Sequence, residues 1–419
     1  MQRLGVPYEI TNDLDALLVY KGPKINYSTT PIEGSLHVFP TPLLFTDSIE
    51  VQQISVTNEK WWKKIFFQSK GDIPFDVFAA AFYLLSRYEE YLPAEHDHHN
   101  RYSHKNSCAF INDFLDIPLV DIWALQLKWQ FETHFNFHEF NLPKFSFVST
   151  IDIDFAFRYR GIGYTRYWLK LFNELFHFRL KTVIEQINVG ISYKNDPYDT
   201  YDWIRKIGES NKIEVRYFAL LCNGTEYDKN ILPYNDVMRN LIQKLSQQHA
   251  IGLHPSYNTS ENIDLLQHEK SLLDEYTEKK SNSSRQHFLR YTLPETYNQL
   301  IDNGITDEYS VGYSALPGFR ASTSHPFKFF NVEKNKTYPL TLHPISIMDV
   351  NYKKHLEATP QFAFADIEKR INEVKKVNGT FISLWHNSNL SHHEGWLPWK
   401  EVFRKMHTLA ASKQQQEID

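Results

Sequence analysis

Apolar and polar positions follow one pattern in the first third of the chain and another beyond it. In the first part, short strand-like runs lie among prolines and turn residues, at 34–39 and 48–51. Apolar residues recur at helical spacing over 76–90, and a second helix is expected over about 118–135. Grouped rather than alternating elements are typical of an α+β domain, which we place at residues 1–140.

Beyond the linker, apolar runs rich in β-branched residues alternate with helical patterns. Seven strand-like runs are expected at 147–151, 215–221, 250–254, 284–288, 309–313, 338–345 and 380–386. Helical patterns lie between most of them, at 200–212, 236–249, 261–279, 294–303 and 361–377. This alternation predicts a second domain at residues 145–411 with a parallel α/β sheet, either open or closed into a barrel.

The composition narrows the class of protein. With 42% hydrophobic and 23% charged residues, the chain resembles an ordinary globular protein. A net charge of −5 provides no overall basic field, so no nucleic-acid partner is expected. The two cysteines, Cys108 and Cys222, are too few for a disulfide scaffold or a cysteine-based zinc site. The chain ends in a polar tail at 412–419.

The sequence also predicts where the protein resides. No apolar stretch is long enough to span a membrane, and the first residues lack the apolar run of a secretory signal. We therefore expect a cytoplasmic protein. This expectation depends on Met1 being the true start of the chain.

The most informative stretch is 145–154, where an apolar run ends in Asp152 and Asp154. Carboxylates at this spacing share one face of a strand. Two like charges this close require a cation, a shared proton or full solvation. A solvated pair is the alternative interpretation, and polar residues on other strands argue against it.

Several other predicted strands carry polar residues at or near their ends. They are His254 and Asn258 after the third run, Arg285 and His287 in the fourth, Asp307 and Glu308 before the fifth, and Trp385 and His386 in the last. Carboxylate and imidazole together suit a borderline divalent metal. Groups left over would supply a base and an acid. Three further histidines at 95–101 lack a fixed ligand spacing, and an exposed loop is expected there.

The ordered set of motifs resembles the polysaccharide deacetylases of carbohydrate esterase family 4, the NodB-homology type. The motifs of a bacterial branch with an N-terminal domain of unknown function are more similar, at 82–90, 284–288, 293–296, 309–313 and 318–321. The resemblance covers nearly the whole chain. It implies an α/β fold, a distorted seven-stranded (β/α) barrel preceded by a smaller α+β domain. It also implies a divalent metal, with zinc expected.

The resemblance also assigns roles to individual residues. Asp152 matches the general base, Arg285 the arginine that orients this base, and His386 the general acid. Asp154 and His254 match metal ligands, although the family's two aspartates are adjacent and these are separated by one residue.

One position departs from the family pattern. The second histidine of the family's histidine motif falls on Asn258, which leaves the metal one imidazole short. Either Asn258 offers its carbonyl oxygen or His287 enters from the next strand.

The remaining candidates surround these residues. Asp307 or Glu308 is expected to hold His386 in place. Arg320 is a second arginine for orienting the base or for anchoring an anionic substrate group. Trp385 is a candidate for contact with the substrate.

These observations predict a metal-dependent hydrolase that removes N-acetyl groups from a sugar of a bacterial polysaccharide or glycoconjugate. The alternative is a catalytically decayed protein of the same fold that binds glycans or acts as a scaffold, which the Asn258 departure favours. A nucleotide-handling enzyme lacks support, because the chain has neither a P-loop nor a glycine-rich dinucleotide turn.

Overall fold

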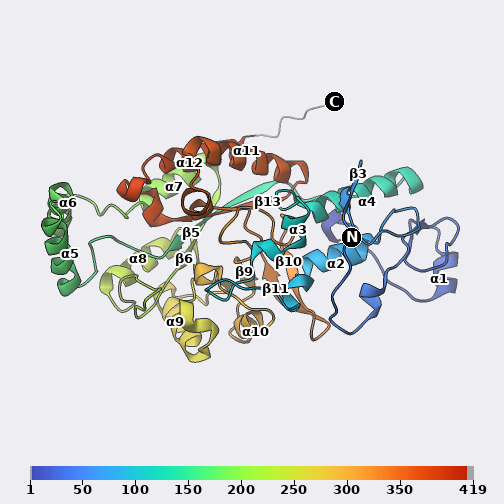
Figure 1. The fold of residues 1–419 in the computed structure, drawn as a ribbon, viewed down its shortest axis with the longest axis horizontal. Coiled ribbons are helices and arrows are strands. Elements are labelled where there is room, and N and C mark those ends of the chain that lie inside the picture. The colour runs from blue at the N-terminus through green and yellow to red at the C-terminus, as the bar shows by residue number, and fades with distance from the viewer. Residues whose placement is uncertain (1, 413–419) are drawn as a thin grey trace. The chain divides into compact units, whose positions relative to one another are not determined.

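The computed structural model describes residues 2–412, so residues 413–419 of the polar tail lie outside it. The chain forms two compact units, each assembled from several segments (Figure 1). Unit 1 comprises the residues up to Ser146 together with Gly318–Pro339 and Asn372–Phe381. Unit 2 comprises Phe147–Pro317, Leu340–Ile371 and the residues from Ile382 onward.

Unit 1 mixes short strands with helices. Its elements are β1 (Ile25–Asn26), β2 (Leu36–His37), β3 (Thr57–Glu59), β4 (Lys63–Ile65), α1 (Leu14–Val19), α2 (Val77–Leu85), α3 (Cys108–Ile111), α4 (Leu119–Phe135), β10 (Phe327–Asn331) and most of β11 (Lys336–Leu342). The helix predicted over 76–90 begins where the Asp76 carboxylate accepts a hydrogen bond from the backbone N–H of Ala79, 3.0 Å away. It ends earlier than predicted, because Arg87 adopts a left-handed backbone conformation with φ of 56°.

Unit 1 gains the distant segment Gly318–Pro339 through the buried carboxylate of Asp121. Asp121 accepts hydrogen bonds from the Thr323 hydroxyl at 2.7 Å and from the Ser324 N–H at 2.8 Å. These bonds satisfy a buried charge that would otherwise be costly. They join residues about 200 positions apart in the sequence, so no local sequence pattern predicts this contact.

Unit 2 is built on the central part of a mostly parallel sheet. The strands are β5 (Ser146–Ile153), β6 (Glu214–Ala219), β7 (Ala250–Leu253), β8 (Ser283–Ser284), β9 (Asp307–Glu308), β12 (Ile347–Met348) and β13 (Thr380–His386). The order is β11-β9-β8-β7-β6-β5-β13-β12, with β10 beyond β11. Pairing is parallel from β5 through β9, between β9 and β11, and between β12 and β13. The carboxyl ends of β5 to β9 therefore meet at one edge.

Within the described residues, eight α-helices accompany these strands. They are α5 (Tyr164–Phe176), α6 (Leu180–Gly190), α7 (Tyr201–Asn211), α8 (Asp236–Ser246), α9 (Ile263–Thr277), α10 (Glu295–Asp302), α11 (Pro360–Lys376) and α12 (Trp399–Ala411). Side-chain caps fix two of the starts, because Asn235 and Asn262 accept hydrogen bonds from the first turns of α8 and α9. Helices α5, α6 and α12 were not predicted from the sequence.

The predicted seven-stranded barrel is not confirmed. Among the described residues the sheet runs from β10 at one edge to β12 at the other, and it is open. The run predicted at 284–288 forms only the two-residue strand β8. The rest of the run leads into a short turn at His287–Leu289, where Phe288 adopts a left-handed φ of 62°.

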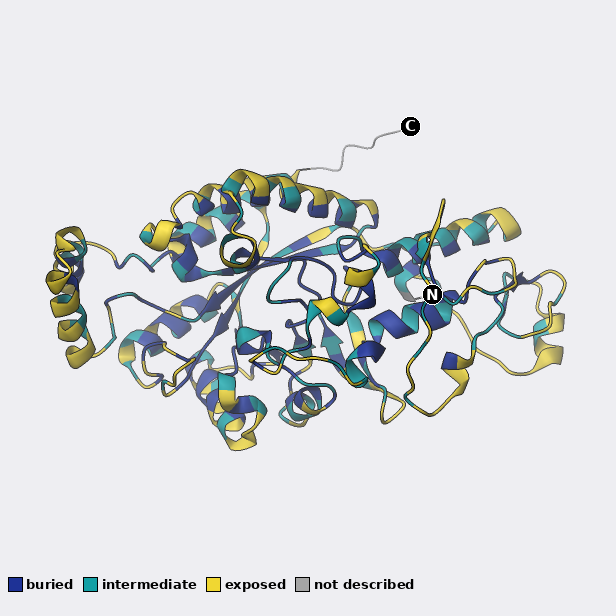
Figure 2. Ribbon diagram, in the orientation of Figure 1, coloured by how far each residue is buried: buried dark blue, intermediate teal, exposed yellow. Residues whose placement is uncertain are grey.

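The core of unit 2 lies between the sheet and its neighbours, where the strands in Figure 2 are mostly dark blue. It includes a cluster formed by Phe218, Leu289, Tyr309, Ile345, Met348, Ile382 and Leu384. Each such side chain contributes about 1.5–3 kcal/mol by leaving water. This core holds the strand ends in place. Of the helices in the described part of the chain, none combines the length and the apolar content needed to cross a bilayer.

The buried His407 on α12 should make the protein sensitive to acid. It lies against the rings of Phe147 and Phe403, and burial lowers its pKa to about 4. Because the unfolded chain binds this proton near pH 6.5, stability falls as pH drops from about 6.5 towards 4. His407→Asn should therefore reduce the loss of unfolding free energy between about pH 7 and pH 5 by roughly 2 kcal/mol.

Chemical denaturation at both pH values measures this effect. The exposed His134→Asn serves as the control and should leave the pH dependence unchanged. An equal pH dependence in wild type and His407→Asn would show that His407 is not the group responsible.

Candidate active site

The two carboxylates at the end of β5 lie in different surroundings. Asp152 is the penultimate residue of β5 and is 2% exposed, whereas Asp154 follows the strand and its side chain is 17% exposed. Alternation along the strand places Thr150 and Asp152 on the same face. Thr150 accepts a hydrogen bond from Nη2 of Arg285, 2.7 Å away, and this bond links β5 to the residue after β8.

Three histidines from three other strands converge on Asp154. His254 follows β7, His287 follows β8, and His386 ends β13. Their Nε2 atoms lie 3.2, 3.7 and 3.5 Å from the Asp154 carboxylate, respectively. Asp154 is thus the common neighbour of all three imidazoles.

The other ring nitrogen of each histidine is occupied by a hydrogen-bond acceptor. Nδ1 of His254 bonds to the backbone carbonyl of Arg285, Nδ1 of His287 lies 2.7 Å from Asp228, and Nδ1 of His386 lies 2.8 Å from Asp349. These oxygens accept, so each Nδ1 carries the proton. In a neutral ring Nε2 then presents its lone pair to Asp154, which is the tautomer that a metal requires.

The pKa values in this cluster reflect its opposed charges. Burial alone would raise the pKa of Asp154, but His386 and His287 hold it well below its usual value. Burial would lower the pKa of both histidines, yet Asp154 and Asp228 raise the pKa of His287 to about 9. Asp349 and Asp154 raise the pKa of His386 to about 10. Each group therefore keeps its charged form through its neighbours.

Asp152 lies between a guanidinium and an imidazole. Its Oδ1 is 3.8 Å from Nε of Arg285, and its Oδ2 is 3.7 Å from Nε2 of His254. Arg285 is fully buried over the ring of Phe218, and burial lowers its pKa while Asp152 and Glu308 oppose that change. Oδ1 of Asp152 is buried without a hydrogen-bond partner among the described residues, so it is available to a ligand.

Asp154, His254 and His287 fit a divalent metal. Their donor atoms all lie within 4.8 Å of one another, and Oδ1 of Asp154 is buried without a hydrogen-bond partner among the described residues. Two ligands of a tetrahedral zinc at about 2.0–2.2 Å lie roughly 3.3–3.6 Å apart. The contacts from Asp154 to the two imidazoles, 3.2 and 3.7 Å, are close to this spacing.

A second group of possible metal ligands is present elsewhere in unit 2. It consists of Glu185 on α6 and the consecutive His392 and His393. Glu185 already lies 2.6 Å from one imidazole and 2.7 Å from the other, so direct hydrogen bonds account for this group.

Three predicted residues have surroundings of their own. Asn258 is exposed in the short turn Tyr257–Ser260. Asp307 pairs with His343 at 2.8 Å. Glu308 accepts hydrogen bonds from the hydroxyls of Ser284 and Ser310, and burial raises its pKa to about 7.

The prediction that Asp307 or Glu308 holds His386 is therefore wrong. Asp349, directly after β12, contacts Nδ1 of His386 and also accepts the His386 backbone N–H at 3.0 Å. The sequence did not reveal Asp349 because β12 was not recognised as a separate strand. Asp228, the partner of His287, lies in a loop after β6 and carried no motif.

Arg320 and Trp385 are engaged in structural contacts. Arg320 is 2% exposed and lies in unit 1, where it donates two hydrogen bonds of 2.8 and 2.7 Å to Glu90. This pairing leaves it a poor candidate for an anchor of an anionic substrate. Trp385 is fully buried and meets Phe403 edge-on at 5.3 Å, so it packs in the core of unit 2.

Comparison with known proteins adds two findings. Residues 1–136 match a family described as a family of unknown function (DUF7033). The comparison with curated proteins gives no match.

Three solved structures are similar to about two thirds of the chain. A protein described as a polysaccharide deacetylase from Mycobacterium smegmatis has 13% identity and a TM-score of 0.42, covering 65% of this chain and 85% of that one. A probable polysaccharide deacetylase from Pseudomonas aeruginosa PAO1 has 9% identity and a TM-score of 0.39, covering 64% and 85%. The 4-alpha-glucanotransferase from Thermococcus litoralis has 11% identity and a TM-score of 0.39, covering 65% and 38%. Similarity at this level assigns neither activity nor ligand to this chain.

Proposed function

We propose that this protein is a metal-dependent hydrolase that removes N-acetyl groups from a sugar of a bacterial polysaccharide or glycoconjugate. The observation that carries the proposal is the convergence of His254, His287 and His386 on Asp154, with Asp152 beside them. This arrangement supports a metal ligand set together with a separate base and acid. Zinc is the expected metal, because one carboxylate and two imidazoles are a common catalytic zinc set.

Each residue of the site has a separate role in the proposed hydrolysis. A divalent metal bound by Asp154, His254 and His287 would polarise the amide carbonyl and lower the pKa of the attacking water. Asp152 accepts a proton from this water at its carboxylate. His386, protonated by virtue of its raised pKa, donates a proton from Nε2 to the departing amine. Water and the amide are consumed, and acetate and the free amine are formed.

The buried arginine has a positioning role in this scheme. Arg285 holds Thr150 through Nη2 and keeps its positive charge near Asp152. Arg285 therefore orients the base without contacting the substrate.

The structure also bears on the alternative of a decayed, glycan-binding protein. That alternative rested on the missing imidazole at Asn258. His287 supplies a second imidazole whose Nε2 faces Asp154, and it is held by Asp228. In metal sites, a carboxylate commonly accepts the other ring N–H of a ligating histidine and fixes its orientation. This supports the enzyme over the decayed protein.

Mass spectrometry of the sugar product tests the proposal. Zinc-loaded protein incubated with N-acetylated oligosaccharides should yield products that have lost acetyl groups, whereas Asp154→Ala should yield none. If wild type leaves a broad panel of N-acetylated sugars intact while binding them, the decayed alternative replaces the enzyme.

Replacing the carboxylate behind His386 should slow the reaction without removing the metal. Asp349→Asn keeps the shape of the side chain but weakens the hold on His386, so kcat should fall by about 10–100-fold. KM and metal content should stay unchanged, because Asp349 contacts no metal ligand. Steady-state kinetics measures kcat and KM, and elemental analysis measures the metal content. A raised KM with unchanged kcat would contradict the role of Asp349 in holding His386.

A further inference from the structure

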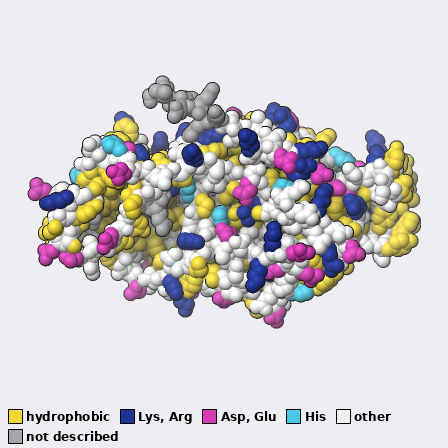
Figure 3. All heavy atoms as spheres, turned by 180° about the vertical axis from the view of Figure 1, so that it is seen from behind, with side chains coloured by type: hydrophobic (Ala, Val, Ile, Leu, Met, Phe, Trp, Pro, Cys, Tyr) yellow, Lys and Arg dark blue, Asp and Glu magenta, His cyan; other side chains and the backbone are white. Residues whose placement is uncertain are grey.

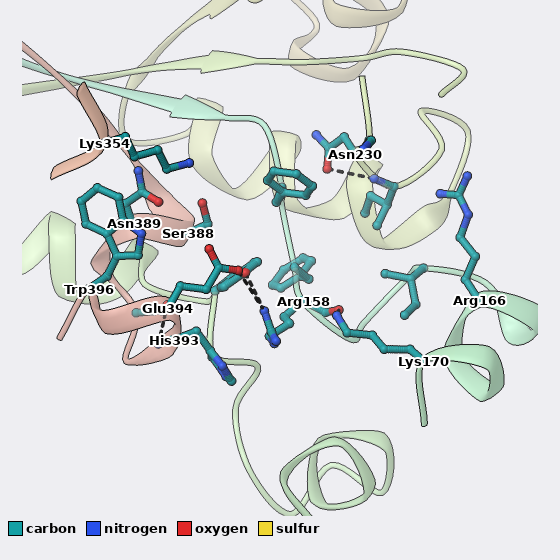
Figure 4. Close-up of a pocket in the computed structure, with 17 residues that line it drawn as sticks. Arg158, Arg166, Lys170, Asn230, Lys354, Ser388, Asn389, His393, Glu394 and Trp396 are labelled. Carbon is teal, nitrogen blue, oxygen red and sulfur yellow. Dashed lines mark hydrogen bonds and ion pairs between the residues drawn. The ribbon is translucent and has the colours of Figure 1, made fainter. Parts of the chain in front are cut away.

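A cavity of about 470 Å³ adjoins the candidate active site within unit 2 (Figure 4). Asn389, which lines it, donates a hydrogen bond of 2.8 Å to Asp349, the carboxylate behind His386. Phe155, which follows Asp154, lines it as well. A ligand in this cavity would therefore lie next to the proposed catalytic residues.

The lining of the cavity is strongly basic. Five cationic side chains face it, against one carboxylate, that of Glu394. The cations are Arg158, Arg166, Lys170, Lys229 and Lys354. Glu394 lies 3.9 Å from Arg158 and is 65% exposed, so it neutralises only part of this charge. The cavity has a positive field in a protein whose net charge is −5.

Two of these cations are partly withdrawn from water. The Lys170 ammonium donates to the backbone carbonyl of Arg158 at 3.1 Å and lies over the ring of Tyr159. Burial and the nearby Arg158 charge lower the pKa of Lys170 to about 8. Keeping two positive charges together away from water is unfavourable, and a bound anion would offset that cost.

Exposed lysines on their own are usually solvated, and Lys229 and Lys354 have that character. Lys170 and Arg158, by contrast, lie together in a cavity beside the active site and are partly withdrawn from water. We propose that this cavity binds a phosphate group carried by the sugar substrate. Several convergent cations suit the multiple charges and oxygens of phosphate. The proposal rests on the deacetylase function, and it names the class of sugar acted upon.

Binding of inorganic pyrophosphate to the metal-free full chain tests the anion site directly. The double variant Lys170→Gln with Arg166→Gln should bind pyrophosphate at least about tenfold more weakly than wild type, because each lost charge-assisted bond is worth about 1.5–3 kcal/mol. The exposed Lys206→Gln, outside the cavity, is the matched control. Absence of binding to wild type, or equal affinity in the double variant, would overturn the site.

A kinetic arm links the anion to the substrate. With a phosphorylated N-acetyl sugar, the double variant should raise KM about tenfold or more, while the kinetics on the neutral N-acetyl sugar stay unchanged. Equal loss on both sugars would overturn the assignment to the substrate's phosphate. Pyrophosphate binding that the double variant abolishes, without acetate release from either sugar by wild type, would support the anion site and overturn the deacetylase function.

A separate surface, the hairpin of α5 and α6, exposes an unusual number of apolar side chains. In the rear view of Figure 3, yellow side chains gather at the right end, where this hairpin lies. The exposed set includes Leu169, Phe172, Phe176, Phe178, Ile184 and Ile191, which are 58–87% exposed. A cluster of this kind marks an interaction site more often than a solvated surface.

The buried side of the hairpin combines the apolar Val183 and Val189 with the polar Gln186 and Glu174. Gln186 is fully buried and exchanges hydrogen bonds with the backbone and side chain of Tyr167, at 2.7 and 3.0 Å. Glu174 is 7% exposed. The helices thus turn part of their polar surface inward and their aromatic residues outward, the reverse of an ordinary surface helix.

The charge of the hairpin points to its partner. Residues 164–191 contain four Lys or Arg and two Glu, so the hairpin has a small positive net charge within an acidic chain. A second copy of the same hairpin would present like charges, whereas anionic lipid headgroups present opposite ones. Exposed Phe and Leu flanked by Lys and Arg are typical of helices that lie in a membrane interface.

We infer that the α5–α6 hairpin docks on a bilayer surface that carries anionic lipids. The apolar side chains enter the acyl boundary, and the basic residues pair with headgroups. Helix α5 also contributes Arg166 and Lys170 to the cavity, so docking would bring that cavity to the lipid surface. The whole-chain net charge concealed this local basic segment.

Co-sedimentation with vesicles tests the docking surface. Wild type should bind vesicles of mixed phosphatidylcholine and phosphatidylglycerol, bind phosphatidylcholine alone weakly, and release from the mixed vesicles at high salt. Phe176→Ser with Phe178→Ser should weaken partitioning by about tenfold or more, since each Phe contributes about 1.5–3 kcal/mol on burial. Phe362→Ser, at a Phe on α11 that is 59% exposed and lies outside the hairpin, is the control and should have no effect.

Light scattering tests the other possible occupant of this surface, a second copy of the chain. Two results would show that the hairpin is not a lipid-docking surface. One is that wild type fails to bind anionic vesicles, and the other is that wild type forms a dimer that Phe176→Ser with Phe178→Ser abolishes. Retention of a monomer that binds vesicles supports the inference.

Discussion

Asp152→Asn should reduce acetate release by about 10²–10⁴ while leaving the bound metal in place. The amide keeps the size of the carboxylate but does not accept the proton of the attacking water. The metal site should survive because Asp152 is not one of the proposed metal ligands. Its carboxylate lies 3.7 Å from His254 and 3.8 Å from Arg285. Single-turnover kinetics together with elemental analysis measures both quantities.

Asp307→Asn is the matched control for this experiment. Asp307 is also a strand-end aspartate that the sequence proposed for the site, but it pairs with His343. Turnover in this variant should equal that of wild type. Wild-type rates in Asp152→Asn, or equal losses in both variants, would mean that Asp152 is not the base.

His287→Ala should lower zinc affinity by at least about 100-fold. Loss of a group that only hydrogen-bonds to a metal ligand already lowers metal affinity by about 10–100-fold, and His287 is proposed as a direct ligand. Alanine removes the Nε2 that faces Asp154 and leaves Asp228 without its imidazole partner. Competition with a chromogenic chelator measures the dissociation constant, and turnover should fall with metal occupancy.

Changes at Asn258 serve as the contrast. Because Asn258 is exposed in the turn Tyr257–Ser260, Asn258→Ala and Asn258→His should both leave zinc affinity unchanged. Tighter binding in Asn258→His would show that this position faces the metal after all. Unchanged affinity in His287→Ala would remove His287 from the ligand set.

Much of the candidate site could be predicted because strand ends are visible in a sequence. Asp152, Asp154 and His254 follow recognisable apolar runs, and parallel strands bring such ends together. The structure places them side by side, and their roles stay proposals. The partners Asp228 and Asp349 were missed, because a loop residue and a residue after a two-residue strand leave no periodic pattern.

The fold was harder to predict where local patterns conflict with burial. Helices α5 and α6 were missed although apolar residues of α5 recur at helical spacing, at Trp168, Leu169, Phe172 and Phe176. The open sheet could not be distinguished from a barrel, since both arise from the same alternation of strands and helices. Segment 318–339 joins unit 1 through buried bonds to Asp121, a long-range contact that no window of sequence contains.

The central claim is that Asp154, His254 and His287 hold a metal on which hydrolysis of an N-acetyl sugar depends. The most direct measurement is acetate release by one preparation before chelation, after chelation and after zinc is restored. The account predicts activity that disappears on chelation and returns with about one zinc per chain. Acetate release that persists in the fully chelated protein, or its absence in the zinc-loaded protein, would contradict the account.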